Sequence, residues 1–453
     1  MRSKKMKNRL SFKLLAACLL APSISDAQTR PNILFLFADD QRGGTIRALG
    51  NDEIITPNLD QLALNGTSYV NNYIMGGSVA AVSQPSRAML MTGRHLFSLN
   101  RDGGVIPQTH VTMGEALRNV GYHTYGIGKW HSDRPAFNRC FAGGGKIFFG
   151  GMDDHWNVQV HDYDRSGAYN TPKRNPGTHS TDLFSEQAIH FINNHDARHP
   201  FFMYVSYMSP HDPRDMPKKY VDMYDTARIA LPPNFMERHP FDNGELNVRD
   251  ELLLGFPRKK QDVKMEILKY YAMITHMDEQ IGNVIAALKN SGLYENTIII
   301  FAADNGLAVG QHGLLGKQSM YEHSLNVPLI FVGKDFEAGK VDERFTYLHD
   351  IFPTICEVAN IPVPASVQSQ SVLSKEKREV MYYAYRNFQR AVRKDHFKLI
   401  EYRVGGVETT QLFDLKDDPW EINDLSKDAQ YADILAEMKR QLLIQKKIYE
   451  NEY

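Results

Sequence analysis

Residues 32–40 run NILFLFADD, a near-continuous apolar segment that closes on Asp39 and Asp40. An apolar run without polar alternation is typical of a strand that is buried on both faces, as strands of parallel sheets are. Similar runs recur at residues 201–207, 297–303 and 327–332. Helical patterns lie between them, at residues 57–64, 113–120, 182–194 and 263–289. Strands that alternate with helices predict an α/β fold, with a large, mainly parallel sheet and helices on both of its faces.

The character of the sequence changes near residue 373. Short strand patterns follow at residues 380–385, 390–392, 397–402 and 411–415, and a helical pattern spans residues 431–449. These patterns predict a small C-terminal antiparallel sheet with a helix packed on it. We therefore expect a large α/β domain over residues 28–372 and an α+β subdomain over residues 373–453.

Two long segments of the large domain, residues 133–180 and 231–261, show little periodicity. The first is rich in Gly, Asp, His, Asn and aromatic residues, and we interpret it as an excursion over the surface. Long segments without a pattern in a compact domain are usually functional or mobile.

The first 27 residues resemble an export signal, because basic residues precede a short apolar run at residues 14–22 and small residues follow it. The run is too short to anchor the chain in a bilayer, and no later segment is apolar enough, so no transmembrane anchor is predicted. Cleavage near Ala27 is favoured. The alternative is a lipid anchor at Cys18, since Leu15-Ala16-Ala17-Cys18 fits a bacterial lipobox. The predicted location is the periplasm or cell surface of a Gram-negative bacterium.

The bulk composition excludes several classes of function. Lys and Arg total 52 against 53 for Asp and Glu, a net charge of −1, so nothing indicates nucleic-acid binding or a coat for polyanions. Of the cysteines, only Cys140 and Cys356 would follow a cleaved signal, so the fold is not a disulfide scaffold. Any recognition of anions must therefore come from a local cluster of basic side chains and not from the net charge of the chain.

Polar residues follow two of the predicted strands directly. Asp39 and Asp40 end the first strand, and Asp304 and Asn305 follow the strand at residues 297–303. Ligand groups in parallel sheets gather at the carboxyl ends of strands. Four oxygen-bearing side chains suit a hard divalent cation such as calcium, whereas three crowded carboxylates without a cation would repel one another.

Four short motifs occur in order along the chain. They are Ser83-Gln84-Pro85-Ser86-Arg87 with Thr92-Gly93-Arg94, then Gly128-Lys129-Trp130-His131, Ser209-Pro210-His211 and Gly316-Lys317. Each alone has an ordinary explanation, such as a proline in the first turn of a helix. Together they resemble the type I, formylglycine-dependent sulfatase family of the alkaline phosphatase superfamily, in the form of a serine-type bacterial carbohydrate sulfatase. The resemblance spans about residues 30–425, but the stretch after His131 lacks the family's common Leu-Gly.

The resemblance implies a chemical role for each motif. A maturation enzyme would oxidise Ser83 to formylglycine, whose hydrate attacks sulfur, and Arg87 would hold that hydrate. Asp39, Asp40, Asp304, Asn305 and the oxygen at position 83 would bind the metal, and asparagine at 305 favours Ca²⁺ over zinc. Lys129 and Lys317 would contact the sulfate. His131 would take a proton from the hydrate, and His211 would protonate the departing alcohol. Residues 28–372 would then be the catalytic domain.

The substrate is less constrained than the chemistry. By resemblance, we predict a sulfated carbohydrate, with exo action on 4-O-sulfated galactose or N-acetylgalactosamine. Candidate sugar contacts are His95, Arg214, His155 and His161. The alternatives are a uronate 2-O-sulfatase, a phosphodiesterase or phosphonate hydrolase of the same superfamily, and a glycan-binding pseudosulfatase in which Ser83 stays unconverted.

Overall fold

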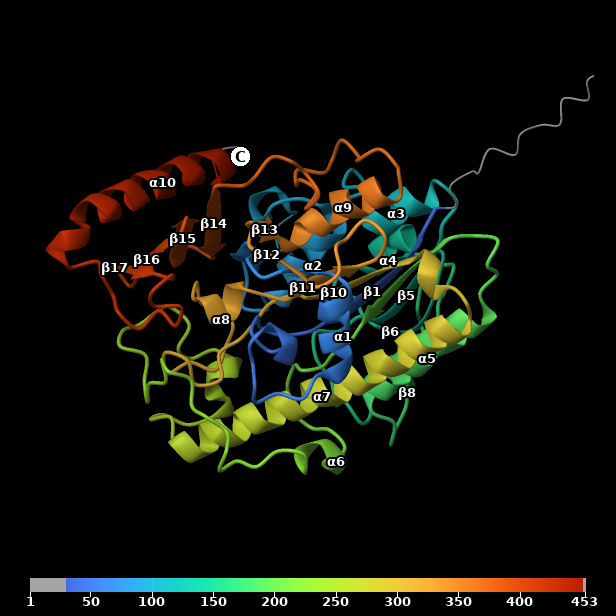
Figure 1. Ribbon diagram of the computed structural model, residues 1–453, viewed down its shortest axis with the longest axis horizontal. Coiled ribbons are helices and arrows are strands. Elements are labelled where there is room, and N and C mark those ends of the chain that lie inside the picture. Colours follow the sequence, from blue (N-terminus) through green and yellow to red (C-terminus); the bar gives the residue numbers. More distant parts are fainter. Residues whose placement is uncertain (1–29, 101, 451–453) are drawn as a thin grey trace, which may run out of the picture.

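The computed structural model describes residues 30–100 and 102–450, so the predicted export signal and Cys18 lie outside the described residues. An eight-stranded sheet forms the centre of the molecule, in the order β12-β2-β11-β10-β1-β9-β5-β6 (Figure 1). Its strands are β1 (Asn32–Ala38), β2 (Thr67–Tyr69), β5 (His123–Lys129), β6 (Gly143–Phe148), β9 (Phe201–Ser206), β10 (Thr297–Ala303), β11 (Leu329–Val332) and β12 (Lys340–Asp342).

The predicted first strand lies in the middle of this sheet. β1 pairs in parallel with β10 on one side and with β9 on the other, and every residue of β1 is buried. Because both neighbours are parallel to β1, the carboxyl ends of β1, β9 and β10 meet at one edge of the sheet. β11 runs antiparallel to β10 and to β2, so the sheet is mainly but not wholly parallel. The predicted fold class is confirmed.

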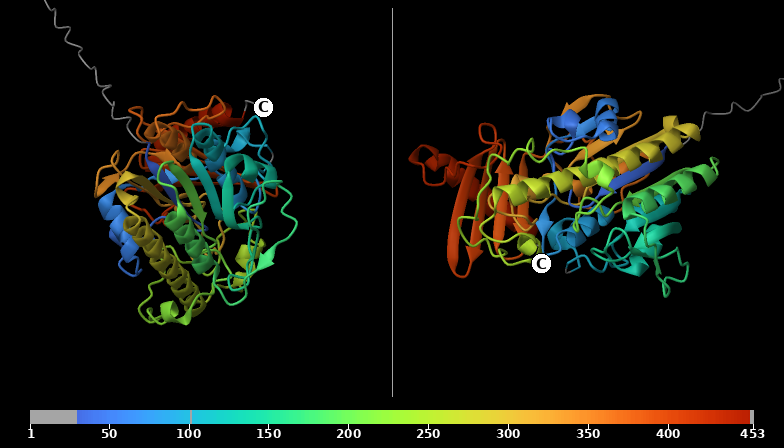
Figure 2. Two further views of the ribbon diagram at one scale, coloured as in Figure 1. Left: turned by 90° about the vertical axis from the view of Figure 1, so that its right-hand side faces the viewer. Right: turned by 90° about the horizontal axis from the view of Figure 1, so that it is seen from below.

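Helices cover both faces of the sheet, as Figure 2 shows. On one face, α1 and α5 pack against the long helix α7. On the other face, α2, α3, α4 and α9 form a connected layer. The helices are α1 (Pro57–Asn65), α2 (Ser83–Thr92), α3 (Met113–Arg118), α4 (Arg134–Cys140), α5 (Ser180–Asn194), α6 (Lys218–Val221), α7 (Lys260–Asn290), α8 (Glu322–Leu325), α9 (Ile351–Val358) and α10 (Ala432–Glu450). No helix in the described ranges combines the length and apolar character that a bilayer crossing requires.

A second sheet has five strands, in the order β17-β16-β15-β14-β4. They are β4 (Gly76–Gly77), β14 (Val380–Tyr385), β15 (Gln389–Lys394), β16 (Phe397–Val404) and β17 (Val407–Asp414). β14 to β17 are antiparallel and α10 packs on them, as predicted. β4 joins β14 in parallel and comes from the chain segment just before Ser83. The small sheet is therefore tied directly to the segment that leads into α2.

The interpretation of residues 133–180 as a surface excursion was wrong in part. This segment forms α4, the edge strand β6 of the main sheet, and a small pair of strands, β7 (Gln159–Val160) and β8 (Lys173–Arg174). β6 begins Gly143-Gly144-Gly145, and three glycines have no apolar pattern that would predict a strand. The glycines have a packing reason, since a Cβ on Gly144 would lie 2.6 Å from the carbonyl oxygen of Gly126 on β5. A further pair, β3 (Asn72–Tyr73) and β13 (Thr346–Tyr347), lies beside the main sheet.

One buried cation joins the small sheet to the large domain. Lys398 on β16 is fully buried, and its Nζ lies 2.9 Å from Glu322 Oε1 and 2.8 Å from Glu421 Oε1. Burial raises the pKa of Glu421 to about 7, although the ammonium of Lys398 opposes that shift. Removing one partner from such a group leaves uncompensated buried charge.

We expect Lys398→Met to lower the free energy of unfolding by about 3–5 kcal/mol, because Glu322 and Glu421 lose their shared cation. Lys394→Met is the matched control. Lys394 pairs with Glu437 at 3.0 Å, but both side chains are about one third exposed, at 32% and 34%. Its loss should cost less than about 1 kcal/mol. Denaturant unfolding of both variants checks the difference, and equal losses would contradict it.

Candidate active site

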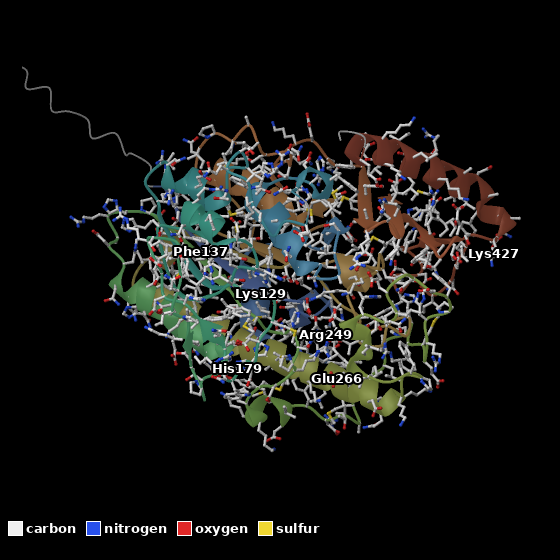
Figure 3. All side chains as sticks on the ribbon, turned by 180° about the vertical axis from the view of Figure 1, so that it is seen from behind. Lys129, Phe137, His179, Arg249, Glu266 and Lys427 are labelled. Carbon is white, nitrogen blue, oxygen red and sulfur yellow. The ribbon has the colours of Figure 1, made fainter. Side chains whose placement is uncertain are left out.

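The residues singled out from the sequence converge at the carboxyl edge of the main sheet. Asp39 and Asp40 follow β1, and Asp304 and Asn305 follow β10. Lys129 is the last residue of β5, and Figure 3 places it near the centre of the molecule. The parallel register brings these strand ends together, because β1 pairs with β10 and β9 pairs with both β1 and β5.

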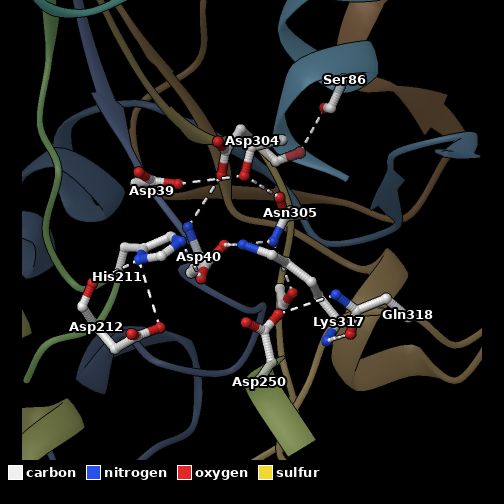
Figure 4. A network of polar contacts seen from close by, with 12 residues as sticks. Asp39, Asp40, Ser86, His211, Asp212, Asp250, Asp304, Asn305, Lys317 and Gln318 are labelled. Carbon is white, nitrogen blue, oxygen red and sulfur yellow. Dashed lines mark hydrogen bonds and ion pairs between the residues drawn. The ribbon is translucent and has the colours of Figure 1, made fainter. Parts of the chain in front are cut away.

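The acidic side chains form one buried cluster (Figure 4). The backbone N–H of Asp40 donates to Asp304 Oδ1 at 3.0 Å, and Asn305 Nδ2 donates to Asp40 Oδ1 at 2.7 Å. Burial, followed by the charge of Asp304, raises the pKa of Asp39 to about 8. Asp40 has φ 64°, a left-handed conformation that Asp tolerates better than most residues. Three carboxylates are thus held within reach of one another away from water.

Three buried cations lie against these carboxylates. Arg87 Nε donates to Asp304 Oδ2 at 2.8 Å, Lys317 Nζ donates to Asp40 Oδ1 at 2.7 Å, and Lys129 Nζ contacts Asp39 Oδ2. Burial raises the pKa of Asp304, but the charges of Arg87, Lys129 and Lys317 outweigh it and hold that pKa below its usual value. Each of the three carboxyl groups therefore contacts one basic side chain.

Ser83, the first residue of α2, lies on this cluster. Its Oγ donates to Asn305 Oδ1 at 2.9 Å and lies 3.4 Å from Asp39 Oδ1. The side-chain oxygen of position 83 and the four predicted ligand residues therefore occupy one small region. Such an all-oxygen donor set fits a hard divalent cation.

His131 lies two residues beyond Lys129 and lines the same cavity as Ser83. Its backbone is left-handed, at φ 66°. Burial, followed by the charges of Lys129 and Arg87, lowers its pKa to about 2. The ring is thus neutral at ordinary pH and has a lone pair that can accept a proton. Its Nδ1 is buried and has no hydrogen-bond partner within residues 30–100 and 102–450.

His211 lies in the loop after β9, and its Nε2 faces the acidic cluster. Nδ1 donates to the carbonyl oxygen of Asp212 at 2.7 Å, and Nε2 lies 3.6 Å from Asp40 Oδ2. Burial lowers the pKa of His211 well below its usual value, and Lys317 and Lys129 add to that effect while Asp40 opposes it. A bound anion would raise this pKa again, because it favours the charged ring.

A cavity of about 220 Å³ opens beside Ser83. Its lining residues are Ala80, Ala81, Ser83, His131, Gly151, Met152, His211, Val248, Arg249, Asp250, Lys317 and Gln318. Both unpatterned segments of the sequence contribute to this wall. Arg249 and Asp250 were not singled out from the sequence, since a charged pair in an irregular loop carries no signal by type alone. Arg249 is half-exposed and pairs with Asp250 at 2.8 Å and with Asp212.

The four candidate sugar contacts are not among the residues that line this cavity. Arg214 is buried in an ion pair with Glu266 at 2.7 Å. His95 hydrogen-bonds Ser98 at 2.9 Å, and His161 packs against Phe149 and Tyr169. His155 is fully buried behind His211. Residue type alone could not tell these enclosed positions from exposed ones.

Comparison with known proteins gives two matching family models. One, described as Sulfatase, matches residues 31–361, and one described as N-sulphoglucosamine sulphohydrolase, C-terminal, matches residues 310–448. An arylsulfatase from Clostridium perfringens is 30% identical, and the match covers 91% of this chain and 94% of that protein. An N-acetylglucosamine-6-O-sulfatase from Bacteroides thetaiotaomicron is 26% identical over 92% of this chain and 86% of its own.

A solved structure described as a complex with its substrate D-glucosamine-2-N,6-O-disulfate has the same fold. It superposes with a TM-score of 0.72 at 23% sequence identity, and the match covers 93% of this chain and 99% of that one.

We expect Ca²⁺ to raise the thermal stability of the protein, by about 2.7 kcal/mol at a concentration one hundred times its dissociation constant. Asp304→Asn and Asp40→Asn should each remove most of that ligand-induced gain, because each removes a charged oxygen donor. Asp250→Asn is the matched control, since it lines the cavity outside the donor set. Thermal unfolding with and without Ca²⁺ measures the gain, and an unchanged gain in both cluster variants would count against this site.

Proposed function

Because the chain belongs to the sulfatase family and is a sulfuric ester hydrolase, we propose that it removes sulfate from a sulfated carbohydrate, with position 83 as the nucleophile. One observation carries this proposal. Ser83 Oγ lies 2.9 Å from Asn305 Oδ1 and 3.4 Å from Asp39 Oδ1, in a cavity that Lys317, His131 and His211 also line. A nucleophile, charge-stabilising cations and two titratable imidazoles thus meet at one point.

The acidic cluster is proposed to hold Ca²⁺ through Asp39, Asp40, Asp304, Asn305 and the oxygen of residue 83. Asn305 supports calcium over zinc, because it offers an oxygen where a histidine would offer nitrogen. When bound, such a cation supplies positive charge that polarises a sulfate oxygen and acidifies a nearby hydroxyl.

We propose that Ser83 is converted to formylglycine by a maturation enzyme. The hydrated aldehyde supplies two geminal hydroxyls, one to attack sulfur and one to expel sulfate afterwards, which a serine cannot do. Arg87 donates to Asp304 and is buried beside position 83, where it would oppose the negative charge of the hydrate. Lys129 and Lys317 are placed to stabilise the charge on the sulfate as it redistributes.

The two histidines are assigned opposite proton transfers. His131 lines the cavity beside Ser83, so it is placed to take a proton from the second hydroxyl. His211 directs Nε2 toward the cluster and the cavity, so it suits protonation of the departing alcohol. A sugar alkoxide is a poor leaving group, and this proton is therefore needed more than it would be for a phenol.

The small volume of the cavity supports a small substrate. At about 220 Å³ it is smaller than the ~300–1,000 Å³ of typical ligand sites, which favours one terminal sulfated sugar and exo action. The sequence points to 4-O-sulfated galactose or N-acetylgalactosamine. The relative from Bacteroides thetaiotaomicron instead favours a 6-O-sulfated N-acetylglucosamine, and we include both in the proposal. Export to the periplasm or cell surface remains a prediction, because it depends on residues 1–29, outside the described part.

We expect the peptide that contains Ser83 to be lighter than the encoded mass by about 2 Da, because oxidation of serine to an aldehyde removes two hydrogens. Fragment ions should assign this loss to Ser83 and not to Ser86 in the same peptide. Ser83→Ala should abolish the loss and lower sulfate release by a factor on the order of 10⁴ or more. Intact mass and released sulfate test this in protein from the native host. A Ser83→Ala variant with normal turnover would refute the nucleophile.

A substrate panel distinguishes the sugars. We expect release of sulfate from N-acetylglucosamine 6-sulfate or from 4-sulfated galactose and N-acetylgalactosamine, at a rate above that for a 2-O-sulfated uronate. A phosphonate monoester serves as the control for the wider superfamily. Preference for the phosphonate would overturn the proposed substrate class, and binding of sulfated sugars without any turnover by converted protein would favour a glycan-binding role.

A further inference from the structure

The loop that carries His211 is held from behind by two buried histidines. We call residues 209–215 the acid loop, since His211 lies in its centre. His155 and His179 are both fully buried, and their rings stack with centroids 5.0 Å apart and an interplanar angle of 9°. His155 lies in the segment after β6, and His179 is the N-cap residue of α5.

Each of the two rings donates to a backbone carbonyl of the acid loop. His155 Nε2 lies 3.0 Å from the carbonyl oxygen of His211, and His179 Nε2 lies 3.0 Å from that of Asp215. A carbonyl oxygen can only accept, so both rings carry a hydrogen on Nε2. The two histidines thus clamp the acid loop at His211 itself and four residues beyond it.

The Nδ1 atoms of the two rings each accept a hydrogen bond, which is consistent with the hydrogen on Nε2. His155 Nδ1 lies 2.7 Å from Ser180 Oγ, so the hydroxyl donates to it. The backbone N–H of Thr181 donates to His179 Nδ1 at 3.2 Å. Burial lowers the pKa of His155 to about 4, which keeps the ring neutral. Each ring is therefore held from α5 on one side and holds the acid loop on the other.

Two further contacts complete the support of the acid loop. Thr181 Oγ1 lies 2.7 Å from Ser209 Oγ at its start, and the carboxylate of Asp212 pairs with Arg249 at the cavity wall. The start of α5 thus contacts the loop at both ends, while His155 contacts its centre. This arrangement gives His211 little freedom to turn away from Asp40.

The same hydrogen bonds argue against a metal ion among His179, Asp182 and His276, whose ligand atoms lie close together. His179 Nδ1 accepts from the backbone of Thr181, so Nε2 keeps its hydrogen and has no lone pair for a metal. His276 Nε2 instead donates to Asp182 Oδ1 at 2.8 Å, and its ring lies against that of His179 at a tilt of 55°, with centroids 4.7 Å apart. The group is a hydrogen-bonded support and not a second metal centre.

We propose that His155, with His179 beside it, is a positioning residue that fixes the direction of His211 toward the leaving-group oxygen. The inference rests on the proposed function, in which His211 donates that proton. His155 touches neither the cavity nor the acidic cluster, so it acts only through the backbone of His211. A small misplacement of a catalytic group far from the altered residue can cost about 10²-fold in rate.

The test compares two leaving groups on full-length protein in which conversion of Ser83 has been verified by mass. His155→Ala should lower kcat for a sulfated sugar by about 10²-fold, because the alkoxide needs a well-placed proton. It should change kcat for 4-nitrophenyl sulfate by less than about 3-fold, since that phenolate departs unprotonated. His155→Gln keeps an N–H that can reach the carbonyl and should restore most of the lost rate. KM should change little in both variants.

His161→Ala is the matched packing control, because His161 is a buried histidine of the same segment with no contact to the acid loop. Any loss there should be equal for the two substrates. If His155→Ala does not fold, Ser180→Ala carries the test, since it removes only the hydroxyl that orients the ring, and it should show a smaller loss confined to the sugar sulfate.

His211→Ala separates the two proposals. A selective loss on the sugar sulfate in His211→Ala, without one in any foldable His155 or Ser180 variant, would overturn the positioning role and leave the acid role intact. Equal losses on both substrates in His211→Ala would overturn the proposed acid itself. Equal losses on both substrates in His155→Ala, with no rescue by glutamine, would also reject the positioning role.

Discussion

The structure depends on burying three carboxylates, Asp39, Asp40 and Asp304, where three parallel strand ends meet. Removing such charges from water costs several kcal/mol for each ion, and only close partners offset it. Each carboxylate here has its own cation from a different part of the chain: Lys129 from β5, Arg87 from α2 and Lys317 from the loop after β10. The main sheet therefore cannot bury these carboxylates without bringing the site residues together. Because several of these residues lie at strand ends, the sheet holds them rigidly.

The small C-terminal sheet takes part in the same arrangement. Its edge strand β4 needs glycine at position 76, where φ is 104° and a Cβ would lie 2.0 Å from the carbonyl oxygen of Ala384. The chain leaves this strand and enters α2 at Ser83. Gln389 on β15 donates to the carbonyl oxygen of Gln318 at 3.1 Å, and Gln318 donates to that of Ala80 at 2.8 Å. A path of backbone pairing and hydrogen bonds thus connects the small sheet with both walls of the cavity, beside the nucleophile and beside Lys317.

The two proposed proton-transfer groups are built in different ways. His131 follows directly on the end of β5, so the sheet itself places it. His211 lies on a loop, and loops need additional support to hold a side chain within the narrow limits that proton transfer requires. The histidines behind the acid loop supply that support through neutral hydrogen bonds, which introduce no further charge next to an already crowded cluster. This difference explains why His155, 56 residues away along the chain, is needed to hold His211 in place.

The sequence by itself determined the parallel sheet, the two acidic pairs at its strand ends and the order of the motifs around Ser83, because apolar runs and local spacing are encoded within a few residues. Only the tertiary structure decided the rest. β6 was missed because its glycines are selected by the close approach of β5 and not by any apolar pattern. Arg249 and Asp250 reach the cavity, whereas His155 lies behind it. Their long-range partners are Asp212, Gln318 and His211, which are 37, 68 and 56 residues away along the chain. Burial and long-range pairing are properties of the folded chain, so residue type could suggest these side chains but could not tell which of them line the cavity.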